Sequence, residues 1–192
     1  MKGENIKQFS DGIRMIMLCQ RNKDGRDTNK TNRASKRKIS ANGEEFFKIL
    51  KEFREIKNNS DKPLRIYSCV NKRDIKKAIR NFKQEQLDAD YYDEDSRNKF
   101  YFDIRNRWIS SLMKQNCRAE TKFLIDIDHI IKEAKNWDIS YIEEHLEEIG
   151  VKVILKYPTK NGYHIITEPF NPTLWNCEFG EVKKDALLLL DY

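Results

Sequence analysis

Residues 123–129 read Phe-Leu-Ile-Asp-Ile-Asp-His, an apolar run that carries acids at positions 126 and 128. Side chains alternate between the two faces of a β-strand, so Asp126 and Asp128 would share one face while the apolar residues fill the other. We therefore predict a strand over residues 122–128 whose two carboxylates lie side by side, roughly 7 Å apart along the strand.

Two carboxylates on one strand face need a counter-charge. They repel each other, and burying them without a partner costs free energy or raises their pKa. A divalent cation supplies positive charge, and carboxylate oxygens are ligands that Mg²⁺ and Mn²⁺ prefer. Asp126 and Asp128 are thus candidate metal ligands. The alternative is an edge strand whose acids face water or pair with lysines.

A turn and a returning strand follow at residues 158–167, Pro-Thr-Lys-Asn-Gly-Tyr-His-Ile-Ile-Thr. Gly162 allows the backbone of a tight turn to approach a ligand closely. Lys160 places a cation in the turn, and His164 lies just inside the next strand. This combination suits a phosphate clamp. The alternative is a core histidine with its hydrogen bonds satisfied inside the protein.

A third acid, Asp191, follows four consecutive leucines at residues 187–190. An acid that ends such a run would lie at the rim of a sheet or be paired inside the protein. The alternative is an acid near the end of the chain that is simply solvated.

The remaining periodicities predict one α/β or α+β domain over residues 1–192 with a mixed sheet. Asn42 and Glu45 have the spacing of a helix N-cap and its return partner, and Gly150 is placed to end a helix. The predicted strands are 13–19, 64–70, 122–128, 151–157 and 163–167, and the predicted helical patterns begin near 44, 71, 100 and 140.

Residues 20–43 are polar and basic, and we predict a flexible loop that either is simply solvated or guides a nucleic acid strand. The helix predicted from residue 71 also has a basic face, which is either a solvated surface or a phosphate-binding one. An acidic stretch at 88–95 interrupts the positive charge beyond it. The candidate nucleic-acid contacts are Arg33, Lys36, Arg37, Lys38, Lys72 and Arg73.

Composition limits the class of protein. The 192 residues are 39% hydrophobic and carry a formal net charge of +6, which is compatible with a globular core and a polyanionic partner. The four cysteines are widely spaced and form no CxxC pair, so we expect reduced thiols in a cytoplasmic protein. No apolar run is long enough to span a membrane, and the N-terminus lacks the apolar core of a signal peptide.

The three acidic and histidine-containing segments, in this order, resemble the three motifs of the archaeo-eukaryotic primase-polymerase superfamily. These are FLIDIDH, TKNGYHII and LLLLDY, and the resemblance covers residues 120–192. It implies an RRM-like palm joined to an N-terminal αβ unit, with two divalent cations, Mg²⁺ or Mn²⁺, held by Asp126, Asp128 and Asp191. It also implies that His164 contacts the triphosphate of the incoming nucleotide, and that the turn with Lys160, Asn161 and Gly162 helps to hold phosphates.

The expected function is therefore metal-dependent nucleotidyl transfer of the primase-polymerase type. Such an enzyme would initiate or extend a strand from NTP or dNTP on a single-stranded DNA or RNA template, with a replication protein as a candidate partner. Two alternatives stay open: an inactive primase-like module that binds nucleic acid or a replication partner, and a two-metal nuclease. The Lys-, Asn- and Ile-rich composition is compatible with a phage or mobile element, whose protein would lie in the host cytoplasm.

Overall fold

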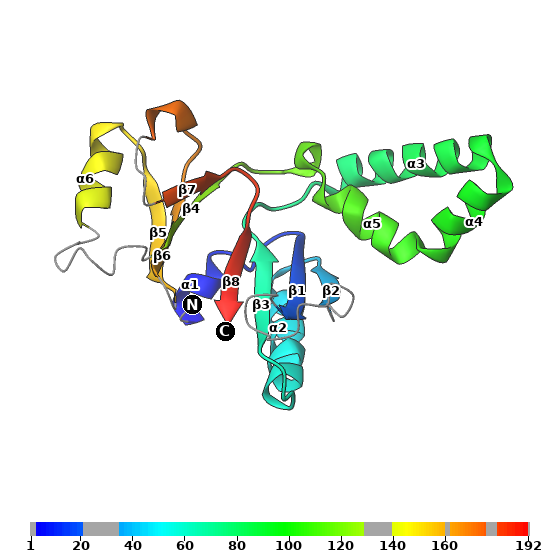
Figure 1. The fold of residues 1–192 in the computed structure, drawn as a ribbon, viewed down its shortest axis with the longest axis horizontal. Coiled ribbons are helices and arrows are strands. Elements are labelled where there is room, and N and C mark those ends of the chain that lie inside the picture. The colour runs from blue at the N-terminus through cyan, green and yellow to red at the C-terminus, as the bar shows by residue number, and fades with distance from the viewer. Residues whose placement is uncertain (1–2, 21–34, 129–139, 160–161, 176–179, 192) are drawn as a thin grey trace.

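The computed structural model describes residues 3–20, 35–128, 140–159, 162–175 and 180–191, and these form two four-stranded sheets with helices (Figure 1). The first sheet has the order β2(Ser35–Ser40), β1(Arg14–Gln20), β3(Leu64–Cys69), β8(Leu187–Asp191). The second sheet has the order β5(Val153–Pro158), β6(Gly162–Thr167), β4(Phe123–Asp128), β7(Gly180–Lys183). The helices are α1(Gly3–Lys7), α2(Gly43–Asn58), α3(Ile75–Tyr92), α4(Glu94–Phe102), α5(Ile104–Met113) and α6(Ser140–Glu148), with short 3-10 turns at Gln115–Cys117 and Pro172–Leu174.

Every strand pairing in these two sheets is antiparallel. The α+β class is thus confirmed, whereas the prediction of a mixed sheet is wrong. Apolar periodicity shows which residues are strands, but it contains no information on the direction in which two distant strands pair.

The first sheet is covered by α2. The buried face of this helix carries Phe46, Ile49, Leu50 and Phe53, which join the core with Ile16 and Ile66 of the sheet. The predicted N-cap is confirmed, because the Asn42 side chain accepts from the Glu45 backbone N–H at 2.9 Å. The Glu45 carboxylate in turn accepts from the Ala41 N–H at 2.7 Å, so the start of α2 is determined by local sequence.

The prediction of a loop over residues 20–43 is wrong for residues 35–40, which form β2, while residues 21–34 lie outside the described residues. β2 pairs only with β1, in a register that places Ile39 opposite Met15. An edge strand can carry charged side chains because one of its edges faces water. The low apolar content of this segment therefore did not exclude a strand.

The second sheet is packed on both faces. Ile125 and Ile127 of β4 join a core with Ile142 and Leu146 of α6, whereas Leu124 packs in the core shared with the first sheet. By alternation, Asp126 lies on the same face as Leu124 and is directed toward the first sheet.

The predicted helix end at Gly150 is confirmed. Gly150 has a φ of 69°, a conformation that favours glycine. Its N–H donates to Glu147 O at 2.9 Å, and the Val151 N–H donates to Leu146 O at 2.8 Å, the hydrogen-bond pair of a Schellman motif.

Helices α3, α4 and α5 form an arm that extends away from the two sheets (Figure 1). The helix predicted from residue 71 begins at Ile75, because the Asp74 carboxylate caps it by accepting from the N–H groups of Lys76 and Lys77. The pattern predicted near residue 100 is divided into α4 and α5 at Asp103. Phe100 is buried, but Ile104 is 45% exposed because it opens the next helix.

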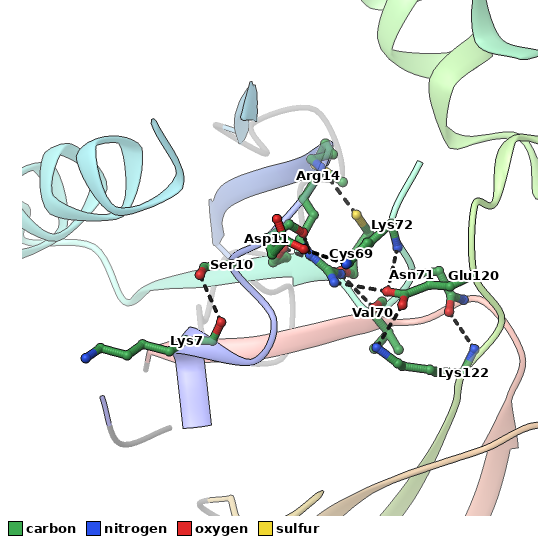
Figure 2. Close-up of polar contacts among 12 residues, drawn as sticks. Lys7, Ser10, Asp11, Arg14, Cys69, Val70, Asn71, Lys72, Glu120 and Lys122 are labelled. Atoms are coloured by element: carbon green, nitrogen blue, oxygen red, sulfur yellow. Dashed lines mark hydrogen bonds and ion pairs between the residues drawn. The ribbon is translucent and has the colours of Figure 1, made fainter. Parts of the chain in front are cut away.

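Arg14 connects the first sheet to the segment that leads into β4 (Figure 2). Its side chain is fully buried and donates to Cys69 O at 3.0 Å, to Val70 O at 2.7 Å and to Glu120 Oε1 at 3.0 Å. Glu120 also pairs with Lys122 at 2.9 Å, just before β4 begins. This cluster fixes the position of the segment between the arm and β4, the strand that carries Asp126.

Candidate functional site

Asp126 and His164 are brought into direct contact. They lie opposite each other on the neighbouring strands β4 and β6, and the His164 Nε2 atom is 3.1 Å from Asp126 Oδ1. Residues directly opposite in an antiparallel pair share a face. The two motifs that the sequence analysis placed in one site are thus adjacent in the fold.

Lys183 of β7 reaches Asp126 from the other side, with its Nζ atom 2.6 Å from Oδ2. The pKa of Asp126 is held well below its usual value, first by the hydrogen bond from His164 and then, against the opposing effect of burial, by Lys183. Burial alone would lower the pKa of Lys183, but the hydrogen bonds and negative charges of Asp126 and Glu181 together outweigh burial, and the pKa is raised.

Tyr157 of β5 extends the row to a third strand. It lies opposite His164, and its hydroxyl is 2.7 Å from His164 Nδ1 and 3.4 Å from the Leu189 carbonyl oxygen in β8. Burial, followed by the negative charge of Asp126, raises the pKa of the Tyr157 hydroxyl, which therefore stays protonated. The result is a polar chain, Lys183–Asp126–His164–Tyr157, that spans the second sheet and touches the first.

This polar chain satisfies His164 in either protonation state. A deprotonated carboxylate only accepts, so Nε2 carries a hydrogen and donates to Asp126. A neutral ring then accepts the Tyr157 hydroxyl hydrogen at Nδ1. A protonated ring donates at both nitrogens, and the Tyr157 hydroxyl donates to Leu189 instead. The arrangement thus gives both ring nitrogens of His164 a hydrogen-bond partner.

Lys183 and Tyr157 were not identified from the sequence. A signal existed for Tyr157, because it directly precedes the predicted turn at 158–162 and His164 follows that turn by two residues, and hairpin pairing brings such residues close together. No local pattern marks Lys183, since β7 comes to Asp126 only through long-range pairing.

The other predicted residues of the turn are only partly described. The Asp128 backbone pairs with Gly162 across β4 and β6, and the Gly162 carbonyl accepts from the Thr159 N–H at 2.8 Å, which closes the turn. The Asp128 side chain and all of Lys160 and Asn161 lie outside the described residues. Their metal and phosphate contacts stay predictions.

Asp191 lies in the first sheet, because β8 pairs with β3. Its carboxylate is 2.7 Å from Lys57 Nζ and 3.0 Å from Arg54 Nε on α2. Burial acts to raise its pKa, but the hydrogen bonds from Lys57 and Arg54 dominate and lower it. No contact among the described residues joins Asp191 to Asp126 or His164, so its share in a common metal site also stays a prediction.

The described side chains do not by themselves complete a metal site. Within the part of the chain that the structure describes, no group of three His, Cys, Asp or Glu side chains is placed to hold a metal ion. Both oxygens of Asp126 are engaged, one by His164 and one by Lys183. A divalent cation at Asp126 would therefore have to replace the Lys183 ammonium.

Arg73, which we predicted as a nucleic-acid contact, is buried. It is 3% exposed and pairs with Asp185 at 2.7 Å and 3.1 Å, so a phosphate cannot reach it in this fold. Burial alone would lower the Arg73 pKa, but Asp185 and Cys69 together outweigh burial and raise that pKa. The prediction failed because helix periodicity was extended over residues that precede the first turn of α3.

The remaining predicted nucleic-acid contacts differ in availability. Lys72 pairs with Asp11 at 2.7 Å and Lys38 with Glu52 at 2.7 Å. Arg37 donates to Asn106 at 2.9 Å, Lys36 is exposed, and Arg33 lies outside the described residues.

A hollow of about 630 Å³ lies elsewhere, between β2, α2 and α5. Its charges are mixed, and two of its three acids are already engaged, Glu52 by Lys38 and Glu45 by the start of α2. It contains none of the residues of the polar chain, and it does not favour one class of ligand.

The fold and the polar chain together define an α+β protein with a charged, partly buried site at the centre of its second sheet. Comparisons with protein-family models, with curated proteins and with solved structures give no match. None of the described helices has the length and apolar character needed to cross a membrane.

Proposed function

We propose that this chain is a nucleotidyltransferase of the primase-polymerase type, with its site at Asp126 and His164. The observation that carries the proposal is the direct contact of these two side chains across β4 and β6. The resemblance to archaeo-eukaryotic primases implies that the aspartate strand and the histidine strand serve one site. The adjacency of Asp126 and His164 supports the proposal.

The described residues supply donors suited to phosphate. His164 and Lys183 both lie against one carboxylate, and the Lys183 side chain is 35% exposed, so its ammonium can turn toward a ligand. Cationic donors stabilise the charge that accumulates on a departing pyrophosphate. Tyr157 orients His164 from behind, which keeps one imidazole nitrogen directed at the site.

The proposal includes Mg²⁺ or Mn²⁺, held by Asp126 with Asp128 and, if the resemblance extends that far, Asp191. When bound, such ions activate the attacking hydroxyl and neutralise the leaving group. The incoming nucleotide would be an NTP or dNTP, and the template a single strand of DNA or RNA.

A second candidate is an inactive module that binds nucleic acid or a replication partner. The observation that favours it is the neutralisation of Asp126 by Lys183 and His164, which leaves its carboxylate paired without any added ion. Such a site is stable as it is, and a metal must compete with an internal lysine.

The test is strand synthesis by the purified protein with Mg²⁺ or Mn²⁺, labelled nucleotides and a single-stranded template, with and without a primer. We expect metal-dependent products that disappear in Asp126→Asn and persist in Glu147→Gln, a matched change at an exposed acid on α6. Thermal unfolding of each variant checks that loss of product is not loss of fold.

Other outcomes would reject the proposal. A shortened template in place of extended strands would identify a nuclease. Template binding without synthesis under either metal would favour the inactive module, and products that survive Asp126→Asn would place the active site elsewhere.

A further inference from the structure

The first half of α3 has a concentrated positive charge. Residues 75–83 read Ile-Lys-Lys-Ala-Ile-Arg-Asn-Phe-Lys, with four cations and no acid. All four cations are exposed. Ala78 is fully buried on the opposite face of the helix, which faces the rest of the arm. Lys76, Arg80 and Lys83 recur at spacings of four and three residues, so they share one face of the helix.

These three cations have no partner in the part of the chain that the structure describes. Lys76, Arg80 and Lys83 make no ion pair or side-chain hydrogen bond with any described residue. Elsewhere in the described parts, cations such as Lys38, Lys72 and Arg54 are paired with acids. Like charges four residues apart on a helix destabilise it by roughly 0.2–0.5 kcal/mol, so an external anion would stabilise this face.

The charge changes sign along the same helix. Beyond Lys83 the chain carries acids, Glu85, Asp88, Asp90, Asp93, Glu94 and Asp95, before the next cation at Arg97. A polyanion would therefore be attracted to the half of α3 nearer the sheets and repelled from the tip of the arm (Figure 1).

The basic face continues at the base of the arm. The backbone of Arg118 forms an isolated β-bridge with the backbone of Arg73, just before α3. The Arg118 guanidinium donates to the carbonyl oxygens of Gln115 and Lys184. Carbonyl acceptors leave its positive charge unneutralised. Along the helix axis, Lys76 to Lys83 cover about 10 Å, which suits an extended backbone with repeated phosphates rather than a single anion.

We propose that this α3 basic face, Lys76, Arg80 and Lys83, binds the phosphate backbone of single-stranded nucleic acid. The proposal rests on the proposed function, because nucleic acid is inferred as the polyanion from the need to hold a template strand beside the sheets. It replaces the buried Arg73 as the contribution of this region to nucleic-acid binding.

The experiment is fluorescence anisotropy of a labelled oligothymidylate, without nucleotide or metal, over a series of salt concentrations. We expect the triple variant Lys76→Ala/Arg80→Ala/Lys83→Ala to bind at least about tenfold more weakly than the wild type. The slope of log K against log salt should fall by about 2, because each lost phosphate contact removes about 0.7 for a single strand.

The control is Lys48→Ala/Lys51→Ala/Lys62→Ala, which removes the same net charge from exposed positions outside the arm. It should bind within about twofold of the wild type, because loss of net charge alone has little effect if binding is local. Thermal unfolding is compared for all three proteins, and the charge-preserving Lys76→Arg/Lys83→Arg variant should retain binding.

Three results would overturn the inference: a triple variant that binds like the wild type, a control that loses as much, or a wild type that binds anionic vesicles and not the oligonucleotide. The proposed function is tested separately. Asp126→Asn should keep oligonucleotide binding while it loses synthesis. A wild type that binds through α3 but makes no product would retain this inference and reject the enzyme.

Discussion

Each side chain of the polar chain is held in place by hydrogen bonds or ion pairs with its neighbours on adjacent strands. His164 lies between Tyr157 and Asp126 in one row across β5, β6 and β4, and Lys183 closes the row from β7. Without the Tyr157 hydroxyl, the Nδ1 atom of the buried His164 loses its hydrogen-bond partner. At this scale the energetics depend on hydrogen bonds more than on exposed charge.

Tyr157→Phe tests this row directly. The change removes the hydroxyl that contacts His164 Nδ1 and the Leu189 carbonyl, while the ring and its packing remain. We expect the free energy of unfolding to fall by about 1–2 kcal/mol, measured by urea denaturation, because a buried nitrogen loses its partner. Tyr141→Phe is the control, since Tyr141 is 58% exposed. Equal stability of the two variants would show that the Tyr157 hydroxyl contributes nothing.

At the scale of single elements, local sequence set several boundaries. Asn42 caps α2, Asp74 caps α3, and Gly150 ends α6. Two of these were predicted, because caps and glycine turns depend on residues within a few positions of each other. The start of α3 was misplaced by four residues, since its basic pattern begins before its cap.

Gly150→Ala isolates the backbone term at one such boundary. Gly150 has a φ of 69°, and a β-carbon added there meets nothing within 4 Å, so only conformational strain opposes alanine. We expect the free energy of unfolding to fall by about 1–2 kcal/mol in urea titrations.

Gly43→Ala provides the comparison, because Gly43 opens α2 without a positive φ and its nearest neighbour would be Ser10 Oγ at 3.4 Å. There alanine should be neutral or stabilising by up to about 1 kcal/mol. If the Gly150 variant were as stable as the Gly43 variant, the positive φ would not be the reason that glycine occupies position 150.

Across the whole molecule, the two sheets and the arm meet at buried ion pairs. Arg14 of β1 with Glu120 joins the first sheet to the segment that leads into β4, and Arg73, just before α3, pairs with Asp185, just before β8. Breaking one partner of such a pair is costly because the other charge stays buried. These contacts lie between residues about a hundred positions apart, so no window of sequence reveals them.

Acid should therefore destabilise the protein. Burial acts to raise the pKa of Glu120, but Lys122, Lys72 and Arg14 lower it below its ordinary value of 4.5, and Asp126 and Asp191 are lowered in the same direction. A folded-state pKa below the unfolded one contributes stability above the unfolded value, which is lost as pH falls through the folded value. We expect the free energy of unfolding to be nearly constant from about pH 7 to 5 and to fall below about pH 4.

Urea titrations at these pH values measure the effect. Glu120→Gln should be less stable than the wild type at pH 7, and its loss between pH 5 and pH 3 should be smaller, because one titrating carboxylate is gone. Stability that rises as the pH is lowered would show that these pairs do not contribute as described.

Some features of the candidate site follow from local sequence, and others depend on long-range contacts. The strand at 123–128, the alternation that separates Asp126 from its apolar neighbours, and the hairpin that returns to His164 follow from residues close in the chain. Those local patterns did not show that β4 pairs with β6, and it was the resemblance to the primase motifs that predicted one site for Asp126 and His164. Neither revealed Lys183, which arrives on β7, or the partner strand of Asp191.

By itself, then, the sequence determined most of the strands and helices, though not β2 or β7, together with several of their boundaries and apolar faces, because periodicity and capping act over a few residues. Only the tertiary structure decided that β8 joins β3, that Lys183 neutralises Asp126, and that Arg73 is buried against Asp185. Pairing of distant strands and burial of charges depend on contacts between remote parts of the chain, and a four-residue run of leucine fits one sheet edge as well as another.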